Sequence, residues 1–101
     1  MHIGVLHLEF TLHGSASLKD KRNVARSLKQ KLRNKFNVAV AEVGNLDNAL
    51  KLTLTVATVG GEYKHVEGRL TKALNMVEAA ATEELTDSWM ELFTPDEANP
   101  A

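Results

Sequence analysis

The sequence predicts an α/β (α+β) protein with a ferredoxin-like fold, a βαββαβ sandwich in which a four-stranded antiparallel sheet carries two helices on one face. Alternating apolar residues and a β-branched segment indicate strands, whereas apolar residues three and four positions apart indicate helices. Their order along the chain is strand, helix, strand, strand, helix, strand. Right-handed crossovers would place the first and third strands centrally, in the order 4-1-3-2. The other face of the sheet would then have no cover within the monomer.

The first strand is expected over residues 2–13, where one face is apolar and the other is polar, as in an antiparallel sheet with one buried face. The apolar positions are Leu6, Leu8, Phe10 and Leu12, and the polar ones are His7, Glu9, Thr11 and His13. Gly14-Ser15-Ala16 would end the strand. Ser17 and Asp20 form a variant of the capping box, whose fourth residue is usually Glu or Gln, and they predict the start of a helix.

This first helix is expected to continue to about Lys35. Its buried stripe comprises Val24, Ala25, Leu28 and Leu32. Five cationic side chains fall within an arc of about 80° around the helix axis, because successive residues are turned by about 100°. These side chains are Lys19, Arg22, Arg26, Lys29 and Arg33. The arc points away from the apolar stripe, so we expect these cations on the exposed side of the helix.

The second half of the chain repeats the alternation of strand and helix. Residues 37–43 predict a β-branched strand, residues 44–48 a turn, and residues 49–59 a third strand. The inward positions of the third strand are expected to be Leu50, Leu52, Leu54 and Val56. A second helix follows Gly60-Gly61 and extends to about Ala81. It would bury Val66, Leu70, Leu74 and Val77.

A last strand is expected over residues 84–93, but its apolar residues fall on both faces, so its facing stays open. They are Leu85, Trp89, Met90, Leu92 and Phe93. Residues 1–93 are expected to form a single domain. Residues 94–101, with two prolines and no periodicity, are expected to be a disordered tail.

The composition is typical of a soluble globular protein. Cysteine is absent, which excludes disulfides, thiolate metal sites and a cysteine nucleophile. No apolar run is long enough for a membrane span, and the N-terminus does not have the pattern of a signal peptide. We therefore expect a cytoplasmic protein that does not bind a membrane.

Positive charge is concentrated in the first helix. Eight of the twelve Lys and Arg residues lie between Lys19 and Lys35, although the net charge of the chain is -1. Residues 73–101 carry seven acids and no Lys or Arg. This asymmetry favours binding to a polyanion. The polyanion-binding residues would be Lys19, Lys21, Arg22, Arg26, Lys29 and Arg33. The alternatives are a solvated helix face and a face that meets an acidic protein surface.

The turn before this helix is a candidate phosphate site, because a helix N-terminus offers free N–H groups and a partial positive charge. It contains Gly14, Ser15 and Ser17. An ordinary connection with a serine cap is the commoner structure. The sequence has neither a Walker motif nor the Gly-rich loop with a catalytic Arg that acylphosphatases need. It therefore indicates no cofactor and no catalytic residue.

The uncovered face of the sheet is a candidate interface. It would carry His7, Glu9, Thr11, Lys51 and Thr53, together with Trp89 if that side chain points outward. A core position for Trp89 is the preferred interpretation, because large aromatic side chains dominate small cores. RNA-recognition motifs stack bases on outward aromatic residues of the two central strands, and none is expected here. His7, Glu9 and His13 could be metal ligands, but no residue that would orient them is evident, and no metal is predicted.

Three stretches resemble the bacterial YlxP-like family of uncharacterised proteins. They are Ile3-Gly4-Val5-Leu6, Ser17-Leu18-Lys19-Asp20-Lys21-Arg22 and Phe36-Asn37-Val38-Ala39-Val40-Ala41-Glu42. The family shows a similar opening strand, an SLKEKR helix start and an FNVSVAEV second strand. Here Asp20 and Ala39 replace the usual Glu and Ser. The likeness continues more loosely through residues 57–59 and 66–78. It implies a ferredoxin-like fold and no established activity. The neighbourhood of the family's genes, among those for translation initiation and ribosome maturation, points towards RNA or a ribosomal particle.

The leading hypothesis is a non-catalytic RNA- or ribosome-associated module that contacts phosphates through its basic helix. The alternative is a protein–protein module, either a homo-oligomer formed over the open sheet face or a complex with an acidic partner on the helix. A small enzyme or a ligand sensor similar to ACT or acylphosphatase domains is a third hypothesis. It would need a pocket with converging polar groups, which the sequence does not indicate.

Overall fold

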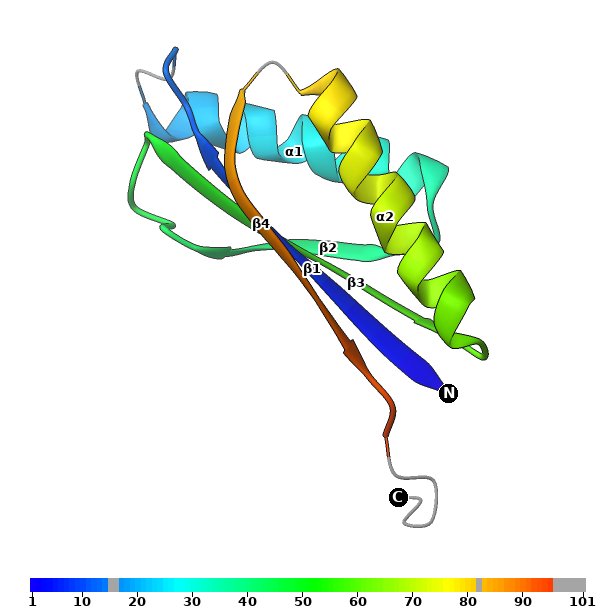
Figure 1. Cartoon of the computed structure of the whole chain (residues 1–101). Coiled ribbons are helices and arrows are strands. Elements are labelled where there is room, and N and C mark those ends of the chain that lie inside the picture. The colour runs from blue at the N-terminus through cyan, green and yellow to red at the C-terminus, as the bar shows by residue number, and fades with distance from the viewer. Residues whose placement is uncertain (15–16, 82, 96–101) are drawn as a thin grey trace.

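The computed structural model describes residues 1–14, 17–81 and 83–95. Its six elements are β1 (His2–Thr11), α1 (Leu18–Lys35), β2 (Ala39–Gly44), β3 (Lys51–Gly60), α2 (Tyr63–Ala80) and β4 (Glu84–Phe93). Neighbouring strands are antiparallel, and their order in the sheet is β2-β3-β1-β4. The predicted ferredoxin-like βαββαβ topology, with β1 and β3 in the centre, is therefore confirmed (Figure 1).

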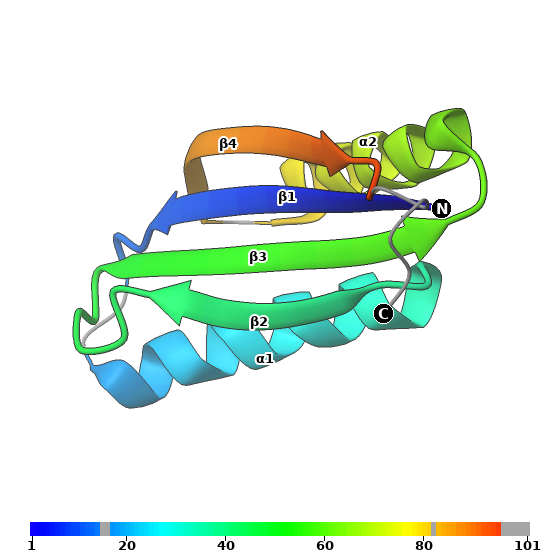
Figure 2. The same cartoon turned by 90° about the horizontal axis from the view of Figure 1, so that it is seen from below.

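Both helices pack on the same face of the sheet, and they leave its other face uncovered (Figure 2). The core between the two layers consists of apolar side chains from β1, β3, α1 and α2. Its members with no exposed surface are Leu6, Leu8, Phe10, Leu32, Leu52, Leu54, Val56, Val66, Leu70 and Ala73. The alternation along β1 and β3 and the helical spacing in α1 and α2 therefore identify the core correctly. Burial of these side chains supplies the main stabilising term of the fold.

Leu50 is an exception to the predicted core. Its side chain is 52% exposed. β3 begins one residue later, at Lys51, and the Leu50 N–H donates to Asn48 Oδ1 at 2.9 Å. Leu50 therefore belongs to the turn before the strand, where the period of two no longer fixes the direction of a side chain.

β4 contains an irregularity that explains why its facing could not be read from the sequence. Its register against β1 shifts at Thr86, which stands without a pairing partner between Leu85 and Asp87. An extra residue in one strand reverses the alternation beyond it. Leu85 and Met90 consequently both pack against the core. Trp89 lies outward with 45% of its surface exposed, so the expected core position of this residue is wrong.

The predicted tail lies only partly within the described residues. Thr94 Oγ1 lies 2.8 Å from His2 Nδ1, which joins the start of the tail to the first strand. Residues 96–101, which the sequence predicts as disordered, lie outside the part of the chain that the structure describes. Within the described ranges, neither helix combines the length and the apolar character that a membrane span needs.

Gly4 lies where β1 passes beneath α2. A Cβ at this position would lie 2.6 Å from Val66 Cγ1 and 2.7 Å from Leu70 Cδ1. Both contacted side chains are completely buried, so they have little room to withdraw. The close approach of strand and helix therefore requires glycine at this point.

The replacement Gly4→Ala is expected to lower the free energy of unfolding by about 1–3 kcal/mol, because the added methyl group overpacks the contact with α2. Urea denaturation measures the change. Gly61→Ala is the matched control, since a Cβ there meets nothing within 4 Å and φ is not positive. Equal unfolding midpoints for Gly4→Ala and the wild type would show that the strand and helix are not packed as described.

Candidate polyanion-binding surface

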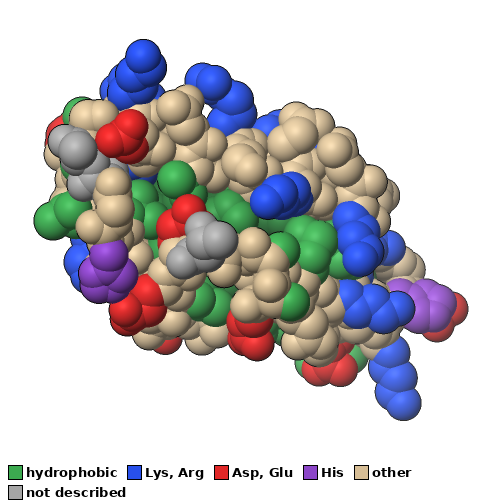
Figure 3. Space-filling view, turned by 90° about the horizontal axis from the view of Figure 1, so that it is seen from above, with side chains coloured by type: hydrophobic (Ala, Val, Ile, Leu, Met, Phe, Trp, Pro, Cys, Tyr) green, Lys and Arg blue, Asp and Glu red, His purple; other side chains and the backbone are tan. Residues whose placement is uncertain are grey.

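Positive charge lies almost entirely on the helical layer. Of the twelve Lys and Arg residues, eight lie on α1, three on α2 and only Lys51 on the sheet. Viewed from the helical side, these side chains stand along the outer edge of the layer and gather at its right-hand end (Figure 3). The edge strand β4 carries acids instead, at Glu84, Asp87 and Glu91. The charge asymmetry along the sequence is thus also a separation in space.

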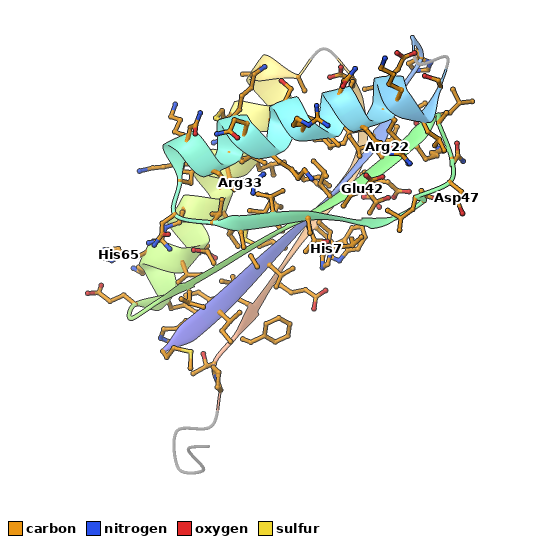
Figure 4. All side chains as sticks on the ribbon, turned by 180° about the vertical axis from the view of Figure 1, so that it is seen from behind. His7, Arg22, Arg33, Glu42, Asp47 and His65 are labelled. Atoms are coloured by element: carbon orange, nitrogen blue, oxygen red, sulfur yellow. The ribbon has the colours of Figure 1, made fainter. Side chains whose placement is uncertain are left out.

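Five cations on one side of α1 form a surface that we call the cationic row: Lys19, Arg22, Arg26, Lys29 and Arg33. Lys29 is half-buried and the other four are exposed. The row is about 21 Å long at a rise of about 1.5 Å per residue, and Figure 4 shows Arg22 and Arg33 towards its two ends. Among the described residues, none of the five forms an ion pair. Their charge is therefore directed to solvent and available to a partner.

Lys21 is not available to this surface, which corrects its predicted role in RNA binding. Its side chain is only 1% exposed. Nζ lies 2.9 Å from Glu42 Oε2 and donates hydrogen bonds to the carbonyl oxygens of Asn45, at 2.6 Å, and Leu46, at 3.2 Å. Lys21 precedes the buried Ala25 by four residues and therefore extends the apolar stripe of the helix rather than the cationic row.

The carboxylate that pairs with Lys21 is also largely buried. Glu42 is 15% exposed and lies on the side of β2 that faces α1 (Figure 4). Its Oε2 contacts the ammonium as an ion, although the contact does not have the angles of a hydrogen bond. Removal of one partner would leave the other charge buried without compensation, which costs far more than the pair itself contributes.

Lys21→Met is expected to destabilise the protein by about 3 kcal/mol, because it leaves Glu42 buried and unpaired. The double variant Lys21→Met/Glu42→Leu should recover most of this loss, since an apolar pair of similar volume avoids the desolvation cost. Urea denaturation of the two variants and of the exposed control Arg22→Gln provides the measurement. A double variant no more stable than Lys21→Met alone would contradict this account.

The candidate phosphate turn is only partly described. Ser17 Oγ accepts a hydrogen bond from the Asp20 N–H at 3.2 Å, which is the ordinary role of a helix N-cap. Gly14 is exposed after the end of β1. Ser15 lies outside the described residues. The predicted cap is confirmed, whereas phosphate binding by this turn stays a prediction.

His7 is the centre of the contacts on the open sheet face. Its ring stacks on Trp89, with ring centroids 4.6 Å apart. His7 Nδ1 lies 3.1 Å from Thr55 Oγ1, and His7 Nε2 lies 3.5 Å from Glu91 Oε1. Trp89 Nε1 donates to the same carboxylate oxygen at 3.3 Å. These contacts hold the exposed indole in one orientation on the surface.

The other predicted interface residues share this face. Glu9, Thr11, Lys51 and Thr53 are all half-buried. They lie on the adjacent central strands β1 and β3, and Lys51 Nζ donates to Thr11 Oγ1 at 3.3 Å. His13 contacts Glu84 Oε1 at 2.8 Å near the other end of β4. The described residues contain no group of three His, Cys, Asp or Glu side chains that could hold a metal ion.

The sequence interpretation missed the cations of α2. Lys64, Arg69 and Lys72 lie on the helical layer, as do the cations of α1. The signal that could have identified them is the spacing from Lys72, which lies three residues after Arg69 and eight after Lys64, because at about 100° per residue both steps keep side chains within about 80° of each other around the helix. Their closeness to Lys35 depends on the packing of the two helices, and no local pattern reveals it.

Comparison with known proteins places the chain among uncharacterised relatives. A family model described as "Protein of unknown function (DUF503)" matches residues 3–90. The uncharacterized protein YlxP of Bacillus subtilis (strain 168) is 29% identical over 91 residues, which cover 90% of this chain and 99% of YlxP. The predicted resemblance to YlxP-like proteins is therefore confirmed.

Solved structures align with the chain at low sequence identity. A mutant of SnoaB, a cofactor-independent oxygenase from Streptomyces nogalater, aligns with a TM-score of 0.52 at 14% identity, over 99% of this chain and 98% of SnoaB. A dimeric ferredoxin-like protein of unknown function from Thermobifida fusca aligns over 92% of both chains, with a TM-score of 0.44 at 16% identity. Likeness at such identities concerns the fold and does not extend to activity.

Proposed function

We propose that this chain, which belongs to the DUF503 family of proteins of unknown function, is a non-catalytic binding module. It docks RNA, free or within a ribosomal particle in the cytoplasm, through the cationic row of α1. Lys and Arg side chains along one side of a helix can each contact a phosphate and displace its counterions. The module would recognise the phosphate backbone and its shape rather than the base sequence.

The observation that carries this proposal is the absence of compensating charge along the cationic row. Like charges three and four residues apart on a helix repel one another, and a merely soluble helix would alternate them with acids. Asp20 is the single acid on α1. Lys21, in contrast, has a buried carboxylate as its partner. The chain neutralises the one cation that it buries and leaves the row beside it free for an anionic partner.

Recognition of bases on the sheet has less support. The outward residues of the central strands β1 and β3 include no Phe, Tyr or Trp. Stacking of single-stranded bases in the manner of RNA-recognition motifs needs aromatic residues at those positions. Trp89 lies on the edge strand β4, next to His7. The helical layer therefore supports RNA binding better than the sheet does.

The double variant Arg22→Gln/Arg26→Gln is expected to weaken RNA binding and to flatten its salt dependence. The slope of log affinity against log salt should fall in magnitude by about 0.7 for each lost contact to single-stranded RNA. Fluorescence anisotropy at several salt concentrations measures the slope. Lys31→Gln/Lys51→Gln is the control, because it removes the same charge outside the row. Equal slopes for the two double variants would reject the row as the binding surface.

A second candidate function is self-association over the open sheet face. Exposed apolar side chains lie on this face: Val59 is 59% exposed, Trp89 45% and Phe93 47%. Val59, Ile3 and Phe93 lie opposite one another on three adjacent strands, which makes this end of the sheet apolar across its width. Apolar patches of this kind on a small protein favour association. The partner would be a second copy of the chain, packed sheet to sheet.

Trp89→Ser is expected to shift such a dimer towards monomer, because the indole supplies a large apolar contact that serine cannot replace. Sedimentation equilibrium over a range of concentrations measures the shift. Tyr63→Ser is the matched control, since Tyr63 is also 45% exposed but lies on α2. A wild-type protein that stays monomeric at the highest concentrations would eliminate this second function.

A further inference from the structure

A groove of about 630 Å³ opens between the end of α1 and the first half of α2, beyond the cationic row. The side chains that define its chemistry are Lys35, Phe36, Lys64, His65, Arg69 and Lys72. Its lining contains no Asp or Glu. In Figure 3 it belongs to the right-hand end of the helical layer, where Lys and Arg side chains gather beside a histidine. Four permanent cations from two helices thus surround one open space.

Two features of α2 at the groove are unfavourable for the stability of the helix. Lys64 and His65 occupy its first turn, where positive charge is unfavourable, and the acid beside them is the N-cap residue Glu62, whose Oε2 lies 3.7 Å from His65 Nε2. Gly68 lies inside the helix, where glycine is less stable than alanine. A Cβ on Gly68 would meet nothing within 4 Å, so packing does not require glycine. Gly68 lines the groove, so a side chain introduced at this position would lie beside its cations.

Arg69 is held in a fixed position on the wall of the groove. Its Nη1 donates to Thr58 Oγ1 and to the Val59 carbonyl oxygen, the second at 3.1 Å. Thr58 is itself buried and donates to the Asn37 carbonyl oxygen at 2.8 Å. Within the described part of the chain, Nε and Nη2 of Arg69 have no hydrogen-bond partner. A guanidinium that is already oriented and keeps donors available is well suited to a phosphate oxygen.

Phe36 supplies an apolar wall to the groove. Phe36 is half-buried at the end of α1 and also lines an adjoining hollow with Met76, Ala79 and Ala80. Sites for single-stranded nucleic acid combine a positive groove with aromatic side chains against which bases can pack. A duplex keeps its bases stacked inside and cannot use such a wall. The combination of cations and an apolar wall therefore favours a single strand over a duplex.

We infer that this groove binds a single-stranded segment of RNA, with phosphates on Lys35, Lys64, Arg69 and Lys72 and a base against Phe36. The inference rests on the proposed function, because the groove and the cationic row would contact the same RNA. The row then supplies attraction for any RNA, and the groove supplies the preference for an unpaired strand.

The test places a negative charge in the groove without weakening the fold. Gly68→Glu directs a carboxylate towards Lys64 and Lys72, one turn away on either side. Gly68→Gln has nearly the same size but no charge, and both replacements improve helix propensity. Urea denaturation should show both variants at least as stable as the wild type. The probes are a short oligouridine, an RNA duplex of the same length and inorganic triphosphate as a competitor.

Gly68→Glu is expected to bind oligouridine about tenfold more weakly than Gly68→Gln, with a change of less than about threefold for the duplex. Equal weakening of both RNAs, or none, would overturn the groove assignment. The proposed function would survive if Arg22→Gln/Arg26→Gln still weakened both RNAs, and it would fail as well if that variant bound like the wild type. Triphosphate that displaces oligouridine at equal ionic strength from Gly68→Gln but not from Gly68→Glu would make the groove a site for free phosphoanions and would overturn the inference.

Discussion

The buried contact between Lys21 and Glu42 fixes the relation of the first helix to the sheet. It joins α1 to β2, and the two hydrogen bonds from Lys21 Nζ to the carbonyl oxygens of Asn45 and Leu46 extend the contact to the turn before β3. Asn45 adopts a positive φ of 55°, and its side chain donates to Thr53 Oγ1 at 3.0 Å. The ammonium thus connects the start of the helix, an edge strand and a turn in an otherwise apolar interface. A buried charge tolerates few other positions, so it specifies how α1 lies on the sheet.

The same contact explains two of the stretches by which the chain resembles its family. Lys21 lies in the Ser17–Arg22 helix start, and Glu42 lies in the Phe36–Glu42 strand. Far apart in the sequence, these stretches meet at one ion pair. The third stretch contains Gly4, which allows β1 to approach α2. Lys21, Glu42 and Gly4 in these stretches are therefore explained by folding, whereas Lys19 and Arg22 of the first stretch belong to the cationic row. Function must be sought in residues that the fold does not use, and the cationic row is such a set.

The sequence predicts most of the fold because local patterns agree with the global packing. Periods of two and of three to four residues identify β1, β3, α1, α2 and their core faces. The failures have specific causes. An extra residue at Thr86 reverses the alternation in β4, so the outward position of Trp89 could not be read. Lys21 has the charge of the cationic row but the helical position of the buried stripe, and its partner is distant in the sequence. The groove beside Lys35 requires the packing of α1 and α2, which no local pattern encodes.

The central claim is that α1 presents cations to phosphates, and the salt dependence of RNA binding by the wild-type protein tests it most directly. Small-subunit ribosomal RNA would be titrated at increasing salt concentrations, with duplex DNA as the comparison. About five phosphate contacts predict a slope of log affinity against log salt of about -3.5 for single-stranded segments, together with a preference for RNA. The absence of binding at low salt, or a slope close to zero, would contradict the account and direct attention to the open sheet face.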